Sequence, residues 1–141
     1  MLKILILSVG ELPPHGFREI GDNFLLFLKK YAQVEIRTCK SPASLLEKAP
    51  ESAFLLDERG TQYSSRSFAS LLTTFEDRGE TITFLLGGPD GFTAREKQPF
   101  RKISLSSMTT THDIAHIFLL EQLFRALSIA HGSSYHRDEP K

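Results

Sequence analysis

Apolar segments and segments of helical periodicity alternate along the whole chain, and this alternation constrains the fold more than any other feature of the sequence. Five segments are apolar at consecutive positions, as strands covered on both faces are: residues 2–7, 34–37, 53–56, 82–86 and, more weakly, 103–105. Between them, four segments read as helices or helical turns: residues 17–31, 41–48, 64–78 and 93–100. Serines at 65 and 67 supply an N-cap for the third of these, and Gly79 ends it. The order predicts an α/β fold with a mostly parallel sheet and helices on both faces.

Composition limits the class of protein. The chain has 141 residues, the size of one domain, and we expect residues 1–141 to form it. Seventeen Lys and Arg balance seventeen Asp and Glu, which excludes a highly basic nucleic-acid-binding tail but not a local basic patch. Cys39 is the only cysteine, so no intrachain disulfide forms, and the longest apolar runs fall far short of the ~20 residues that span a bilayer. We therefore expect a cytoplasmic protein that does not enter membranes.

The segment 113–130 predicts a final helix that is apolar around nearly its whole circumference. Such a helix must be buried on most sides, and one small sheet covers only one of them. We therefore expect a homodimer built on this helix. Glu121 and Arg125 lie four residues apart on its narrow polar stripe. They form either a structural ion pair, with each other or across the dimer, or part of a functional site.

Two stretches of small residues follow predicted strands. Gly87 and Gly88 begin a glycine-rich turn directly after a strand, where ligands bind in open α/β sheets; a tight turn that needs positive φ is the alternative. The turn lacks the Gly-Lys-Ser/Thr of a phosphate-binding loop and the third glycine of a dinucleotide fingerprint. Residues 105–112, Leu-Ser-Ser-Met-Thr-Thr-Thr-His, are mostly small and polar, which favours backbone contacts to a ligand beyond what a helix cap needs.

Two histidines have the spacing of metal ligands on one helix face, His112 and His116. A third ligand is not apparent, so we expect no metal. A serine nucleophile at Ser106 or Ser107 is disfavoured, because no Gly-x-Ser-x-Gly elbow is present.

Two other groups of residues are open to two interpretations. The tail of Tyr135, His136 and Arg137 is either solvated and idle, or it stacks on a base and holds a phosphate. The densest basic cluster is either a solvated face or the footprint of an RNA, and it consists of Arg95, Lys97, Arg101 and Lys102.

Several short motifs occur together in a specific order. They are Ser8-Val9-Gly10, Leu56-Asp57-Glu58-Arg59-Gly60, Ser64-Ser65 with Phe68-Ala69, residues 84–91, Ser104-Leu105-Ser106, Thr109-x-x-His112, residues 121–126 with Ile129, and Tyr135-His136-Arg137. With these motifs the chain resembles the ribosomal RNA large subunit methyltransferase H family of the SPOUT class. The resemblance runs nearly end to end and is strongest over residues 53–137.

The resemblance implies a fold, a reaction and a cofactor site. The fold is an α/β-knot with a C-terminal trefoil knot, in a homodimer that packs through the last helix. The reaction is methyl transfer from S-adenosylmethionine to N3 of a pseudouridine in 23S rRNA, with the ribosome and not DNA as partner. The cofactor lies in the knot against Leu56, Gly87, Gly88, Leu105, Ser106, Ser107, Met108, Thr109 and Thr110.

The resemblance also places four residues around the target base: His112, Tyr135, His136 and Arg137. In this hypothesis the tail holds the nucleotide, and His112 or His136 helps to remove the N3 proton. Glu121 and Arg125 shape the site or the dimer.

The chain departs from the family at two places that bear on activity. His116 stands where many members have an arginine, and Ser133-Ser134 lacks the proline that usually stiffens the tail. These departures support a second hypothesis, a non-catalytic ribosome-binding or assembly module that keeps the fold. A third hypothesis is a generic nucleotide-binding α/β domain, which the missing lysine in the glycine-rich turn disfavours.

Overall fold

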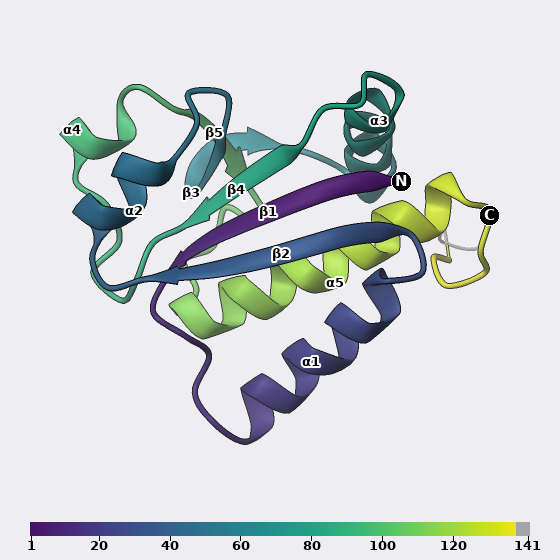
Figure 1. Ribbon diagram of the computed structural model, residues 1–141, viewed down its shortest axis with the longest axis horizontal. Coiled ribbons are helices and arrows are strands. Elements are labelled where there is room, and N and C mark those ends of the chain that lie inside the picture. The colour runs from purple at the N-terminus through teal and green to yellow at the C-terminus, as the bar shows by residue number, and fades with distance from the viewer. Residues whose placement is uncertain (138–141) are drawn as a thin grey trace.

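The computed structural model describes residues 1–137, which form a five-stranded sheet (Figure 1). Every strand pair is parallel, and the strand order is β2-β1-β4-β3-β5. The strands are β1 (Leu2–Val9), β2 (Ala32–Cys39), β3 (Phe54–Gln62), β4 (Ile82–Leu86) and β5 (Arg101–Ser104). The predicted α/β class and parallel sheet are confirmed.

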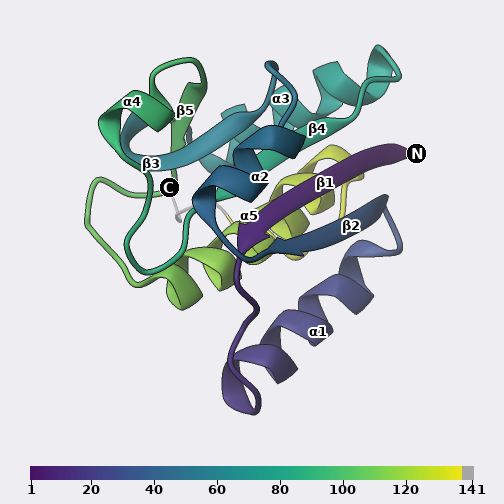
Figure 2. The ribbon, with the colours of Figure 1, turned by 60° about the vertical axis from the view of Figure 1, so that its left-hand side comes forward.

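Helices cover both faces of this sheet, as predicted. They are α1 (Gly16–Leu28), α2 (Pro42–Lys48), α3 (Ser65–Asp77), α4 (Ala94–Lys97) and α5 (His112–Ala130). The long helices α1, α3 and α5 pack on one face, and the short α2 and α4 lie toward the other, near the carboxyl ends of the strands (Figures 1 and 2).

Side-chain alternation divides the core between the two faces. In β1, Ile4 and Ile6 join the cluster under α1, α3 and α5, whereas Leu7 joins the cluster around Leu45 of α2. All five residues of β4 are buried, because this strand lies in the middle of the sheet and is covered on both sides. This burial accounts for the consecutive apolar residues of its sequence.

The third strand is longer than the sequence indicated, and its second half is irregular. Its pairing with β5 shifts register between Leu56 and Thr61, which both lie opposite Ile103, so residues 57–60 bulge out of the ladder; this segment is called the β3 bulge below. A Cβ on Gly60 would lie 2.7 Å from the backbone nitrogen of Ile103, so only glycine lets the two strands approach this closely. The bulge turns the side chains of residues 57–59 away from the regular ladder, and two of them enter the site described below.

The two ends of α3 agree with the sequence analysis except for the identity of the N-cap residue. The N-cap of α3 is Ser64 and not Ser65: the Ser64 hydroxyl accepts a hydrogen bond from the Ser67 N–H, and the Ser67 hydroxyl accepts one from the Ser64 N–H. Gly79 follows the helix with φ of 65°, as expected for a residue that ends it.

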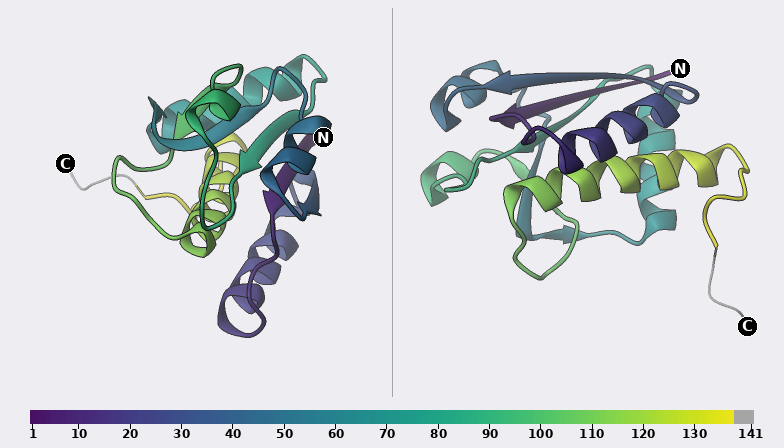
Figure 3. Two further views of the ribbon diagram at one scale, coloured as in Figure 1. Left: turned by 90° about the vertical axis from the view of Figure 1, so that its left-hand side faces the viewer. Right: turned by 90° about the horizontal axis from the view of Figure 1, so that it is seen from below.

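The last helix is covered by its own chain on more sides than the sequence argument assumed. It lies along the sheet between α1 and α3 (Figure 3), so helices as well as strands bury its apolar residues. Among its large apolar side chains only Ile114 is exposed, with 46% of its surface accessible. The premise that only a partner subunit can cover this helix is therefore wrong, while the homodimer and the trefoil knot stay predictions.

No helix within residues 1–137 is long and apolar enough to cross a membrane. Cys39, at the end of β2, is a buried free thiol.

Candidate functional site

A cavity of about 660 Å³ opens at the carboxyl end of β4, beside the middle of β3. Three segments that are far apart in the sequence line it: the β3 bulge, the glycine-rich turn after β4, and the segment between β5 and α5. Ligands of open α/β sheets bind at such an edge. The predicted cofactor residues that line the cavity are Leu56, Gly87, Gly88, Leu105, Ser106, Met108 and Thr110.

Two predicted cofactor residues, Ser107 and Thr109, are exposed and do not line this cavity. The Thr109 hydroxyl instead donates a hydrogen bond of 2.8 Å to Glu58 Oε2. Thr109 therefore links the segment before α5 to the β3 bulge.

The glycine-rich turn is a tight turn and also lines the cavity, so the tight-turn interpretation is confirmed and ligand binding stays a prediction. Gly91 has φ of 63° and its N–H donates to the carbonyl of Gly88, which closes a tight turn. Gly87 and Gly88 have no such backbone requirement, but a Cβ on Gly87 would lie 3.0 Å from the Gly91 Cα and one on Gly88 3.1 Å from Val9 Cγ1. These two glycines allow the turn to pack tightly while it forms the cavity wall.

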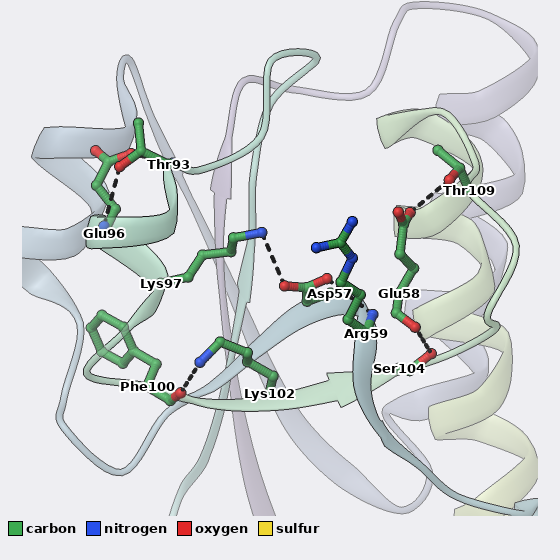
Figure 4. A network of polar contacts seen from close by, with 10 residues as sticks. All are labelled: Asp57, Glu58, Arg59, Thr93, Glu96, Lys97, Phe100, Lys102, Ser104 and Thr109. Carbon is green, nitrogen blue, oxygen red and sulfur yellow. Dashed lines mark hydrogen bonds and ion pairs between the residues drawn. The ribbon is translucent and has the colours of Figure 1, made fainter.

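The sequence analysis did not predict an ion pair that lies at the cavity wall, between Asp57 and Lys97. Lys97 Nζ, at the end of α4, lies 3.1 Å from Asp57 Oδ2 in the β3 bulge, and the Asp57 side chain is 9% exposed (Figure 4). Burial raises the pKa of Asp57. The Arg59 N–H and the Lys97 ammonium lower it by more than burial raises it, so the pKa of Asp57 lies below its usual value. Asp57 is therefore a carboxylate at neutral pH. The signal available in the sequence was the Leu-Asp-Glu-Arg-Gly motif itself.

Glu58 joins the β3 bulge to the segment that follows β5. Its side chain accepts the Thr109 hydrogen bond, and its main-chain carbonyl lies 3.1 Å from the Ser104 hydroxyl, which it shares with the Ser106 carbonyl at 2.9 Å (Figure 4). The two contacts of Glu58 hold two of the cavity-lining segments together. Glu58 was part of a recognised motif but was not predicted as a site residue.

His112 begins α5 and lines the cavity, while its predicted place beside the target base stays a prediction. Its Nε2 is buried and has no hydrogen-bond partner within residues 1–137. One turn further along, His116 is 3% exposed, and neither of its ring nitrogens has a partner in the same part of the chain. Burial, and then the neighbouring His112, lower the pKa of His116 to about 4, so it is neutral at physiological pH.

The other predicted catalytic residues dock beside the middle and last turns of α5, and none of the three lines the cavity. Tyr135 contacts Glu121, which lies nine residues after His112 and so about 13 Å further along the helix axis. Tyr135 donates a hydrogen bond of 3.1 Å to Glu121 Oε1, and Arg125 Nη1 lies 3.2 Å from His136 Nδ1. Arg137 is exposed. The tail is therefore docked on α5 rather than idle.

The predicted basic cluster is largely engaged within the chain. Lys97 pairs with Asp57, as described. Arg101 packs 3.8 Å from the centroid of the Phe54 ring and donates to the carbonyl of Ser52. Lys102 donates to the carbonyl of Phe100. These contacts favour a structural role for most of the cluster, and the RNA footprint stays a prediction.

The comparisons with known proteins agree with this cavity and fold. The family described as "Predicted SPOUT methyltransferase" matches residues 2–136. The chain belongs to the SPOUT methyltransferase family. A ribosomal RNA large subunit methyltransferase H of Neisseria meningitidis serogroup A is 45% identical over 97% of this chain and 100% of its own length. A protein with the same name from Geobacter sp. strain M21 is 34% identical, with the same coverage.

Solved structures support the SPOUT methyltransferase fold. A probable methylase family protein from Haemophilus influenzae superposes with a TM-score of 0.54 at 11% identity, covering 99% of this chain and 72% of that one. At this identity the likeness concerns the fold alone. Together with the family match, it identifies the chain as a SPOUT methyltransferase, and the enzyme interpretation of the sequence is confirmed.

Proposed function

We propose that this SPOUT methyltransferase transfers a methyl group from S-adenosylmethionine to N3 of a pseudouridine in 23S rRNA, acting in the cytoplasm on the ribosome. One observation carries the proposal: a single cavity is lined by residues from all three segments expected to hold the cofactor, Leu56, the Gly87–Gly88 turn and residues 105–110. The rRNA substrate is supported by the relatives from Neisseria meningitidis and Geobacter, which are both named ribosomal RNA large subunit methyltransferase H.

The charge of the cavity fits a cationic cofactor better than a phosphate ligand. Four carboxylates line the cavity, Asp57, Glu58, Asp90 and Asp113, and Lys97 is the only Lys or Arg that does so among residues 1–137. S-Adenosylmethionine carries a sulfonium, which such a lining attracts, whereas a nucleotide phosphate is repelled. This also counts against the generic nucleotide-binding hypothesis.

The cofactor, when bound, supplies the electrophilic methyl group, and this chain supplies alignment and a site for the proton. The glycine turn and the small side chains of residues 105–110 bring backbone close to the ligand. His112 lines the same cavity, and a neutral imidazole there can accept the N3 proton of the target base. We assign the base role to His112 ahead of His136, because Arg125 Nη1 lies 3.2 Å from His136 Nδ1 and donates to it.

The position of the tail argues for a homodimer. Tyr135 and His136 do not line the cavity of their own chain, and Tyr135 docks on α5 about 13 Å along the helix axis from His112, so a nucleotide held by this tail fits the cavity of a second chain better. An apolar stripe for a second copy is present on α1, where Phe17, Ile20 and Phe27 are 37–47% exposed. The Phe27 ring lies 5.5 Å from that of Phe124 on α5, so the stripe continues onto the last helix.

The decisive experiment measures transfer of labelled methyl from S-adenosylmethionine to bacterial ribosomes that lack the modification. Mass spectrometry then locates the modified base. Label on N3 of a 23S pseudouridine is the expected result. No label, from protein shown to be folded and dimeric, would favour the non-catalytic ribosome-binding module instead.

A further inference from the structure

The carboxylates of the cavity differ in how far their charge is already compensated. Asp57 is paired with Lys97 at 3.1 Å. Asp113 lies in the first turn of α5, where the helix dipole offsets a negative charge. Asp90 in the glycine-rich turn is exposed, as Glu58 is, but no hydrogen bond within residues 1–137 holds its carboxylate in place. Glu58 has no ion pair within residues 1–137, and no helix begins at its position.

Glu58 is also held in place from two sides. The Thr109 hydroxyl donates to its Oε2 at 2.8 Å, and its main-chain carbonyl lies 3.1 Å from the Ser104 hydroxyl. In Figure 4 its carboxylate extends from the β3 bulge toward Thr109, which belongs to the segment before α5. A fixed, uncompensated negative charge therefore borders the cavity.

Methyl transfer changes the charge of the cofactor. The bond from sulfur to the methyl group breaks and its electron pair stays on sulfur, while N3 of the base, whose proton passes to the proposed base His112, forms the new bond with its lone pair. The sulfonium thereby becomes a neutral thioether, so the product S-adenosylhomocysteine has one positive charge less than the methyl donor. A fixed negative charge at the cavity attracts the donor more than the product.

We propose that Glu58 is a specificity-determining residue that makes the cavity favour the charged methyl donor over its demethylated product. This inference rests on the proposed function, because it assumes that the cavity holds S-adenosylmethionine. Its consequence is that product leaves and fresh donor binds more readily after each transfer. The attraction acts on the charge of the ligand, so it does not require the methyl group itself.

Calorimetric titration with three ligands tests the proposal. The ligands are S-adenosylmethionine, S-adenosylhomocysteine and sinefungin, which carries an amine in place of the sulfonium. Because Glu58 is exposed and partly screened by water, we expect Glu58→Gln to weaken the two cationic ligands about threefold to fivefold and to leave the product within about 1.5-fold. Glutamine retains an oxygen for the Thr109 hydroxyl, so the local structure is kept. Glu80→Gln, an exposed carboxylate after α3, is the matched control and should change none of the three affinities.

Salt provides a second readout. Raising KCl from about 50 mM to about 500 mM should reduce the donor-to-product affinity ratio of the wild type more than that of Glu58→Gln. Equal weakening of all three ligands by Glu58→Gln, or no weakening of any, would overturn this inference while leaving the proposed function intact. A wild-type protein that binds none of the three would overturn both.

Discussion

The hydroxyl of Tyr135 donates a hydrogen bond to Glu121 Oε1 across 3.1 Å, which attaches the C-terminal tail to the last helix. The same carboxylate accepts hydrogen bonds from Arg125 Nε at 2.9 Å and Nη2 at 2.6 Å, and Gln122 donates to its other oxygen. Burial, and then the Glu121 charge, raise the pKa of Tyr135, so its hydroxyl stays protonated at neutral pH. Glu121 thus organises a network that spans the helix and the tail.

Removing this carboxylate should loosen the tail and destabilise the protein. In Glu121→Ala the half-buried Arg125, whose side chain is 26% exposed, loses its counterion, and we expect the free energy of unfolding to fall by about 1–2 kcal/mol. Amide hydrogen exchange of residues 133–137 should also accelerate. Urea denaturation and exchange measured by mass spectrometry check the two effects.

The matched control for this change is Glu35→Ala on β2. Glu35 pairs with Arg37, but both side chains are more than half exposed, so its removal should cost less than about 0.5 kcal/mol. Equal losses in the two variants would mean that the Glu121 network contributes no more than a surface ion pair.

The buried His116 should make the protein less stable in mild acid. Its pKa is about 4 in the folded chain against an ordinary 6.5, so between these values the unfolded chain binds more protons. Stability is therefore present above pH 6.5 and falls as the pH drops toward 4. From pH 7 to pH 5 the wild type should lose about 2 kcal/mol more than His116→Phe, which carries no titrating group there.

Urea denaturation at both pH values measures this difference, and His116→Asn serves as a second, polar variant. Both substitutions should flatten the pH dependence. If each retains the full acid sensitivity of the wild type, His116 is not the group responsible.

The close approach of β3 and β5 predicts a sharp effect at Gly60. A Cβ at this position would lie 2.7 Å from backbone atoms of both Lys102 and Ile103, and neither can move without breaking the strand pairing. Gly60→Ala should therefore cost about 1–3 kcal/mol of stability. Gly16→Ala, at the start of α1, places its Cβ in open space and should be neutral or slightly stabilising. Thermal unfolding of the two variants makes the comparison, and equal melting temperatures would contradict it.

Periodicity and strand patterning predicted most of the fold, because the buried strands and amphipathic helices obey local rules. The β3 bulge escaped prediction, because residues 57–62 are polar and alternate poorly, and because Thr61 and Gln62 pair with β5 residues that lie 42 positions later in the chain. The cavity was anticipated through its glycines and hydroxyl residues. The Asp57–Lys97 pair was not, because only the folded chain brings α4 beside the bulge. No periodicity shows that α1 and α3 flank α5.

The separation of His112 from the tail leads to a prediction about activity in mixed dimers. His112→Ala and Tyr135→Ala should each lose most methyl transfer, since one removes the proposed base and the other a nucleotide contact. When the two variants are unfolded together and refolded, half of the dimers are mixed, and one site of each mixed dimer combines an intact cavity with an intact tail. Activity should then return to about a quarter of the wild-type level. If the mixture is no more active than the separate variants, each cavity does not work with the tail of the partner chain.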